Sequence, residues 1–378
     1  MASTPIVVRI RISVAPLRKV VLGIHLYLGL AAGIFLAILG LTGSIMAFEG
    51  DIDHWVHPEL WYVTPGPGSL PESELILIAQ NHYYPERVLT VQFPRASDLV
   101  QVMRMTDARI VYINPYNGIV LGDTQGTSST DRLLVYIHEI HLWLIPDPAS
   151  APQLAQAGRS VLSIAALFLC FLAPTGLILW WRRKRLRIRK DPSSPWFVYF
   201  HDVHQILGIY AALLLWIASL TGILIGFDVG GKMFYSITKS VPPAPLKPVP
   251  SVPDVGAEPI QTDQVLNIAR HAMPDASVAM LLMPIRTTGS FTVLMRVPEE
   301  TSQNVHSAVT IDQYSGKVLE VRNYLTDSPG YRLIRLNRSI HNGDIFGFPS
   351  HIIVSLAGLL LPALAISGFV IWRKKLAA

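Results

Sequence analysis

The chain has a single cysteine, Cys170, among its 378 residues. One cysteine excludes a disulfide framework and a thiolate metal cluster, because both need several cysteines. The chain also has no Gly-x-Gly-x-x-Gly loop after a strand, no His-Glu-x-x-His or Cys-x-x-Cys motif, no P-loop and no nucleophile elbow. We therefore predict neither a zinc site nor a nicotinamide or flavin domain, and reducing equivalents for any redox reaction must come from another molecule.

Charged residues are also scarce, at 15% of the chain, whereas 51% of the residues are hydrophobic. Two long segments are polar and rich in proline, and they separate apolar runs that are long enough to cross a bilayer. The sequence therefore predicts an integral membrane protein with two extramembrane domains. The predicted spans are Val20–Phe48, Ser160–Trp181, Ile206–Phe227 and Ile352–Trp372.

Basic residues cluster on one side of these four spans. The positive-inside rule makes that side cytoplasmic, so both termini are predicted in the cytoplasm and both large domains in the periplasm of a bacterial inner-membrane protein. The first apolar run is too long for a signal peptide and is interpreted as a retained anchor. The net charge of +5 comes largely from these clusters, so no nucleic-acid partner is predicted. The clusters are Arg9 to Lys19, Arg182 to Lys190, and Arg373 to Lys375.

The two halves of the chain resemble each other. Each outer segment has a helical pattern, at Glu72–His82 and Thr262–Met273, followed by a strand–turn–strand pattern with an Asn-Gly or Ser-Gly turn. The predicted hairpins are 112–121 and 310–319. The fold class we expect is an α-helical membrane protein with four transmembrane helices in a pseudo-twofold duplicated bundle, plus two small periplasmic α+β domains.

The repeat also divides the chain into predicted segments of alternating location. These are a cytoplasmic N-terminus (1–19), the first span (20–48), a periplasmic domain (49–135), a histidine-bearing connector (136–159), the second span (160–181), a basic cytoplasmic loop (182–200), the third span (201–227), a second periplasmic domain with a proline-rich linker (228–330), a second connector (331–351), the fourth span (352–372) and a cytoplasmic C-terminus (373–378).

Two repeat-matched pairs of histidines are the strongest candidates for a functional site. His25 and His204 lie at the same depth of the first and third spans, each four residues before a glycine, Gly29 or Gly208. An ionisable residue inside a spanning helix is a functional-site candidate. Imidazole is the common protein ligand of haem iron, so this pair is predicted to supply two axial ligands of one haem. The glycines would let a porphyrin lie against the helix backbone.

The second pair, His141 and His341, lies just outside the periplasmic ends of the second and fourth spans. The interpretation as ligands remains open, because a single histidine near a membrane interface is often only a snorkelling or hydrogen-bonding residue. His138 and His201 stand one helical turn before His141 and His204, and either could replace its neighbour or contact a haem propionate. Further candidates are the lesser ligand His351 and the propionate or chelate partners Arg335 and Arg338. The remaining histidines are predicted to be surface residues: His54, His57, His82, His271 and His306.

In these residues the chain resembles the PepSY-associated transmembrane proteins. Within that family it is similar to the ferric-siderophore reductases. The similarity rests on the repeated His-x-x-x-Gly and Leu-Thr-Gly patterns, the two hairpin turns, and the closing Gly-x-x-x-Trp of the second and fourth spans. It implies PepSY-like outer domains and two b-type haems, one near each membrane face. It also implies that electrons from an unidentified cytoplasmic or membrane donor reduce a periplasmic ferric siderophore and release Fe(II). The implied iron ligands are His25 with His204 and His141 with His341.

Two other functions stay open at this stage. One is a haem-bearing electron carrier with a different acceptor, either a quinone or a periplasmic redox protein. The other is a haem-free membrane protein whose PepSY-like domains bind peptide or regulate a partner. Haem content distinguishes the haem-free protein from the reductase. Iron release from a ferric chelate distinguishes the electron carrier from the reductase.

Overall fold

The computed structural model describes residues 15–124, 129–145, 147–181, 186–189, 195–227, 229–242, 251, 258–298 and 307–376. The chain divides into two compact units. One contains residues 1–45, 139–227 and 352–378, and the other contains residues 46–138 and 228–351. Several predicted features lie outside the described residues, namely His306, most of the predicted N-terminal segment, and the basic residues Arg9, Arg11, 182–185 and Lys190.

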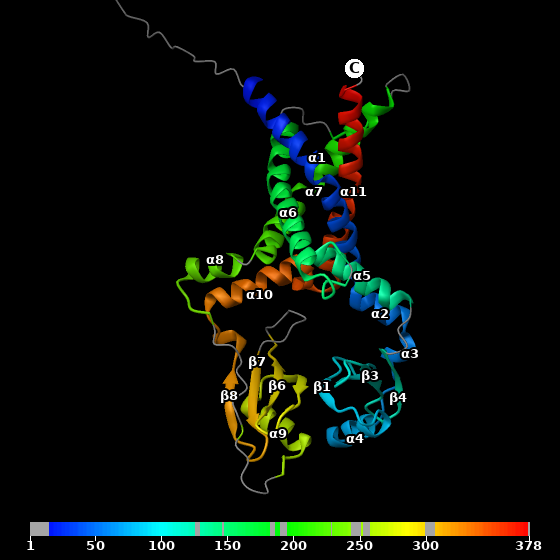
Figure 1. Ribbon diagram of the computed structural model, residues 1–378, viewed down its shortest axis with the longest axis vertical. Helices are drawn as coiled ribbons and strands as arrows, with labels where there is room; N and C mark the ends of the chain where they lie inside the picture. The colour runs from blue at the N-terminus through cyan, green and yellow to red at the C-terminus, as the bar shows by residue number, and fades with distance from the viewer. Residues whose placement is uncertain are drawn as a thin grey trace, which may run out of the picture. The chain divides into compact units, whose positions relative to one another are not determined.

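The first unit is built on four long helices, which Figure 1 shows running beside one another. They are α1 (Ala15–Met46), α6 (Pro152–Trp181), α7 (Trp196–Gly226) and α11 (Phe348–Leu376). Each is long and apolar enough to cross a membrane. They correspond to the four predicted spans, although each of them begins four or more residues earlier than its predicted span.

An alanine and a leucine four residues apart recur in each of these helices and form the centre of the bundle. Residues i and i+4 lie on one face of a helix, so each pair presents one small and one large side chain inward. The small side chains let the helices approach, and the leucines fill the space between them. The buried pairs are Ala32 and Leu36, Ala165 and Leu169, Ala211 and Leu215, and Ala357 and Leu361.

Helices α1 and α11 are in direct backbone contact at Gly40 and Gly358. A Cβ atom built on Gly40 would lie 2.8 Å from the Cβ of Leu361, which is too close, and would also meet the Gly358 carbonyl. Just beyond, the Ser355 hydroxyl donates to the Ser44 carbonyl at 3.1 Å. The Ser44 hydroxyl lies between two acceptors, the Gly40 carbonyl of its own helix at 2.6 Å and the Ser355 carbonyl of α11 at 2.8 Å. Serine hydrogen bonds between helices beside small residues are common in membrane proteins.

Replacing Gly40 with alanine is therefore expected to destabilise the bundle by about 1–3 kcal/mol, since overpacked contacts force the helices apart. Thermal unfolding of the detergent-solubilised protein would measure the loss. Gly23→Ala is the matched control on the same helix, because no atom lies within 4 Å of an added Cβ there. Equal melting temperatures for the two variants would contradict the close α1–α11 contact.

The second unit contains one antiparallel sheet of eight strands in the order β4-β3-β2-β1-β5-β6-β7-β8. The strands of the first half are β1 (Val88–Gln92), β2 (Gln101–Met105), β3 (Ile110–Ile113) and β4 (Val120–Asp123). Those of the second half are β5 (Ser277–Leu282), β6 (Ser290–Arg296), β7 (Ser307–Asp312) and β8 (Val318–Arg322). Strands β1 and β5 pair at the centre, with Val91 opposite Leu281. The two predicted outer domains thus share one continuous sheet.

Helices α4 (Glu72–His82) and α9 (Thr262–Ala272) cover one face of this sheet. Alternate strand residues, such as Phe291, Val293 and Met295 of β6, point into the core beneath the helices, as period-two burial requires. Residues 112–121 and 310–319 are hairpins, as predicted, with Gly118 and Gly316 in left-handed conformations at their turns.

Shorter helices lie in the predicted connectors and in the parts of the predicted outer domains that adjoin the spanning helices in sequence. The first part of the chain has α2 (Glu49–Val56), α3 (Pro58–Trp61) and α5 (Ser129–Trp143), of which α5 includes His138 and His141. The later part has α8 (Val229–Thr238), α10 (Pro329–Asn342) and the short 3-10 helices η2 (Tyr324–Thr326) and η3 (Asp344–Phe346). Both predicted histidine-bearing connectors are therefore largely helical.

Candidate functional site

The structure brings His25 and His204 together inside the four-helix unit. His25 lies on α1 and His204 on α7, with ring centroids 6.3 Å apart and ring planes at 89° to each other. Residues from the two halves of the chain, separated by 179 positions (204 less 25), thus meet as the repeat predicts. This pair is the core of the candidate site.

Each of these imidazoles is held by a hydroxyl from a neighbouring helix. Nδ1 of His25 lies 3.0 Å from Oγ1 of Thr175 on α6. Nδ1 of His204 lies 2.9 Å from Oγ of Ser367 on α11. The two environments match, and all four spanning helices contribute one side chain to them.

A glycine follows each hydroxyl residue and lies against the same ring. An added Cβ on Gly176 would be 3.3 Å from Cε1 of His25, and one on Gly368 would be 3.4 Å from Cε1 of His204. Both distances are tight for a carbon contact, so the absence of a side chain lets each imidazole lie against the helix backbone.

His141 has the same arrangement at the other end of α1. Its Nδ1 lies 2.8 Å from Oγ1 of Thr42, and an added Cβ on Gly43 would be 2.9 Å from its Cε1. Residues 25 and 42 are 17 positions apart, which corresponds to about 26 Å along an α-helix. The first unit therefore carries hydroxyl-held histidines at two widely separated levels.

The His25–His204 pair fits a haem iron as judged by the donor set and its spacing. Two imidazoles that bind one metal from opposite sides, at about 2 Å each, have ring centroids about 6.2 Å apart. The observed separation is 6.3 Å. No group of three or more histidine, cysteine or carboxylate side chains suitable for a metal occurs among the described residues. Two axial histidines are nevertheless sufficient for haem, because the porphyrin supplies the other four donors.

The structure gives the alternative histidine ligands other contacts. Nδ1 of His138 on α5 lies 3.0 Å from a carboxylate oxygen of Glu49. His201 lies one turn before His204, with Nδ1 3.7 Å from a carboxylate oxygen of Asp202. His351 is only 8% exposed and lies 3.3 Å from Asp344. These three histidines face carboxylates, and their exchange with a predicted ligand stays a prediction.

The remaining predicted site residues have these positions. His341 lies in the last turn of α10, and its pairing with His141 stays a prediction. An added Cβ on Gly29 or Gly208 would make ordinary contacts, at 3.7 Å with Leu172 and 3.8 Å with Leu364. Arg335, also on α10, lies over the Tyr331 ring and donates to its hydroxyl, whereas Arg338 is exposed.

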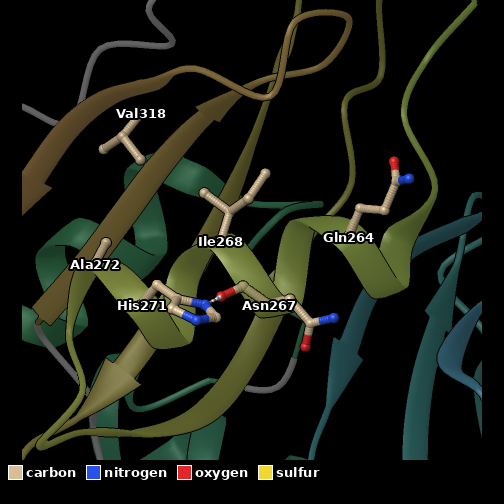
Figure 2. Close-up of a pocket in the computed structure, with 6 residues that line it drawn as sticks. All are labelled: Gln264, Asn267, Ile268, His271, Ala272 and Val318. Atoms are coloured by element: carbon tan, nitrogen blue, oxygen red, sulfur yellow. Dashed lines mark hydrogen bonds between the residues drawn. The ribbon is translucent and has the colours of Figure 1, made fainter.

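A groove of about 530 Å³ lies along α9 beside β8, and the residues that line it do not form a histidine pair like His25 and His204. Its lining includes the apolar side chains Ile268 and Val318, and its histidine, His271, donates from Nδ1 to the Asn267 carbonyl at 2.7 Å within the same helix (Figure 2). An exposed imidazole bonded to its own helix is typical of a surface residue, which agrees with the prediction for His271.

Sequence reasoning noted the Leu-Thr-Gly patterns but missed the contact between hydroxyl residues and histidines, although a signal for it exists. A Ser-Gly or Thr-Gly step occurs in every spanning helix, at residues 42, 175, 221 and 367. The steps at residues 42, 175 and 367 each contact a histidine in the structure. A hydroxyl residue in an apolar helix is usually explained by a bond to its own backbone, so only the shared contact with an imidazole identifies this role.

Four apolar spanning helices and a separate unit built on one antiparallel sheet define a multi-pass membrane protein. Comparison with protein families assigns the chain more narrowly. A model described as the PepSY-associated TM region matches residues 22–375, so the chain belongs to that family. No curated protein matches the chain closely enough to count as a relative.

Proposed function

We propose that this protein is a dihaem b-type transmembrane oxidoreductase that reduces ferric siderophores at the periplasmic face of a bacterial inner membrane. The observation that carries the proposal is the His25–His204 pair. Its centroid spacing of 6.3 Å suits two axial ligands of one iron, and the two rings come from equivalent positions in the two halves of the chain. Membership of a transmembrane family supports the membrane setting.

The residues of the chain have defined tasks in this proposal. His25 and His204 would hold the first haem, and the apolar side chains of the bundle would exclude water around it. A bound haem supplies one-electron transfer at a potential set by its axial ligands and surroundings. The protein contributes the position, the ligand orientation and the low-dielectric environment.

The second haem is proposed to use His141 and His341. The support comes from the sequence repeat and from the hydroxyl and glycine contacts of His141, which reproduce those of His25 and His204. Haems held near both ends of the spanning helices would divide the distance across the membrane into shorter electron transfers. His138, His201 and His351 are alternative ligands or propionate contacts in this scheme, and Arg335 and Arg338 are partners for a propionate or an anionic chelate.

The proposed reaction reduces each ferric ion by one electron, and the electron comes from a reduced cytoplasmic or membrane donor. Fe(II) is held less tightly by the siderophore and is released. The two halves of the extramembrane sheet are proposed to be PepSY-like domains of a duplicated protein, with the large unit in the periplasm and the termini in the cytoplasm.

Reduction of a ferric chelate tests this function directly. The haem-loaded protein in detergent is reduced with a limiting amount of dithionite and then mixed anaerobically with ferrioxamine and a ferrous chelator. We expect reoxidation of the haem, with about one Fe(II) captured per electron delivered. His25→Ala should release much less Fe(II). Reoxidation by a quinone but not by the ferric chelate would favour the electron-carrier alternative.

A further inference from the structure

We infer that Thr175, Ser367 and Thr42 are positioning residues that fix the tautomer and orientation of the haem-binding histidines. This inference rests on the proposed function, because it assigns these hydroxyls a role toward His25, His204 and His141. None of the three residues contacts iron. Each acts through the imidazole to which it is hydrogen-bonded.

The hydroxyl hydrogen of each residue is already committed to its own helix. Thr175 donates to the Phe171 carbonyl at 2.7 Å, and Ser367 donates to the Ala363 carbonyl at 2.7 Å. Thr42 likewise donates to the Ile38 carbonyl at 2.7 Å. A hydroxyl has one hydrogen to donate and two lone pairs to accept with. Because the hydrogen points to the backbone, the oxygen accepts from the imidazole.

The direction of this hydrogen bond settles which ring nitrogen carries the proton. Nδ1 is the atom next to the hydroxyl in all three pairs, so Nδ1 is the donor and is protonated. In a neutral imidazole Nε2 then has a free lone pair. The protein therefore presents Nε2 of His25 and His204 as ready metal ligands before any metal binds.

A second backbone carbonyl lies beside two of these hydroxyls. The Leu172 carbonyl is 3.0 Å from the Thr175 hydroxyl, and the Leu364 carbonyl is 3.1 Å from the Ser367 hydroxyl. The hydroxyl hydrogen therefore has two acceptors on its own helix, and the oxygen is left to accept from the imidazole.

The glycine after each hydroxyl completes the arrangement. The hydroxyl fixes one edge of the ring, and the tight spacing at Gly176, Gly368 and Gly43 limits its rotation against the helix. At the first site, α6 orients the ligand on α1, and α11 orients the ligand on α7.

This contact also predicts an effect on the redox potential. A partner that accepts the Nδ1 proton makes Nε2 a more basic ligand and typically changes metal affinity 10- to 100-fold. A more basic ligand favours Fe(III) over Fe(II). Loss of the hydroxyl should therefore weaken ferric binding more than ferrous binding and raise the midpoint potential of that haem alone. A tenfold change in the ferric-to-ferrous affinity ratio corresponds to about 59 mV for a one-electron couple.

The test is a potentiometric titration of the full chain with its haems bound, for Thr175→Val, Ser367→Ala and Thr42→Val. The first two variants should raise the potential of the haem that His25→Ala removes. Thr42→Val should change the other haem. Thr175→Ser keeps the hydroxyl, so the midpoint potential of this haem should equal that of the wild-type protein. Ser160→Ala is the matched control, because Ser160 on α6 bonds to the Gln156 carbonyl without contacting a predicted ligand.

The outcomes separate this inference from the proposed function. A wild-type protein without haem would overturn both. A wild-type protein with two haems, whose potentials do not move in Thr175→Val and Ser367→Ala, would overturn the positioning role and leave the haem proposal intact. If Thr175→Val does not fold, Ser367→Ala removes a single oxygen and provides the same comparison.

Discussion

Replacing His25 with alanine is expected to remove one of two b haems from the purified protein and to leave the other bound. His204→Ala should have the same effect, since each replacement would leave the proposed haem site with one histidine ligand in place of two. The pyridine haemochrome should then fall from about two haems per chain to about one. His141→Ala and His341→Ala should each remove the other haem.

The pattern among the variants is more informative than any single loss. His25→Ala and His204→Ala should leave identical residual spectra, and the double variant should lose no more haem than either one. His271→Ala is the matched control, because this imidazole is exposed on α9 and bonds to its own helix. Full haem content in all four single variants would show that the proposed pairing is wrong.

The second large effect is expected in the extramembrane unit, where Glu72 begins α4 as a buried acid. Its side chain is 6% exposed and accepts a hydrogen bond from the Gln101 amide at 2.6 Å. The nearby Asp263 of α9 accepts hydrogen bonds from the Glu72 backbone N–H at 2.8 Å and from Ser73. Burial, reinforced by the charge of Asp263, raises the pKa of Glu72 from 4.5 to about 7, although Gln101 and Arg270 oppose this shift.

The raised pKa makes the stability of this unit depend on pH. Between pH 4.5 and 7 the folded chain keeps a proton on Glu72 that the unfolded chain has lost, so folding is favoured by protonation. This contribution is fully present below pH 4.5 and disappears as the pH rises through 7. The shift corresponds to about 3 kcal/mol, so the free energy of unfolding should fall by up to that amount over this range.

Glu72→Gln is expected to remove this pH dependence, because the amide is uncharged at every pH and still offers an oxygen to Gln101. Hydrogen-exchange protection of the β2 and β3 amides, corrected for intrinsic rates, provides the measurement. Protection in the wild type should fall by roughly 100-fold from pH 4.5 to pH 8. The exposed Glu74→Gln is the control and should behave as the wild type. The same pH dependence in Glu72→Gln would contradict the assignment.

Much of the architecture could be predicted because its signals are local. The length of an apolar run predicts a spanning helix, and the Asn-Gly and Ser-Gly turns predict the two hairpins. Helix α4 has the predicted bounds, and α9 ends one residue before its predicted end at Met273. The spans begin earlier than predicted because a helix continues past its most apolar stretch. Pro152, for example, begins α6 eight residues before the predicted span.

The pairing between the two outer domains could not be predicted, since it depends on two strands far apart in the sequence. Strand β1 follows α4 and strand β5 follows α9 in the sequence. Nothing in the sequence of either strand identifies the other strand as its partner in the sheet. The contact between Ser73 and Asp263 could not be predicted from the sequence for the same reason. It places two helix N-termini side by side although the residues are 190 positions apart.

The His25–His204 pair was predictable because the repeat gave both residues equivalent positions. The hydroxyls that hold them were not, because Thr175 and Ser367 belong to the neighbouring helices and their roles depend on packing. The carboxylate contact of His351 also required the structure, since Asp344 is seven residues away across a helix boundary.

Binding of two haems by the spanning helices can be tested with the visible spectrum of the detergent-purified protein. The spectrum should be recorded before and after dithionite, together with a pyridine haemochrome. We expect sharp reduced α-bands and about two b haems per chain. A colourless protein, even after expression with a haem precursor, would contradict it.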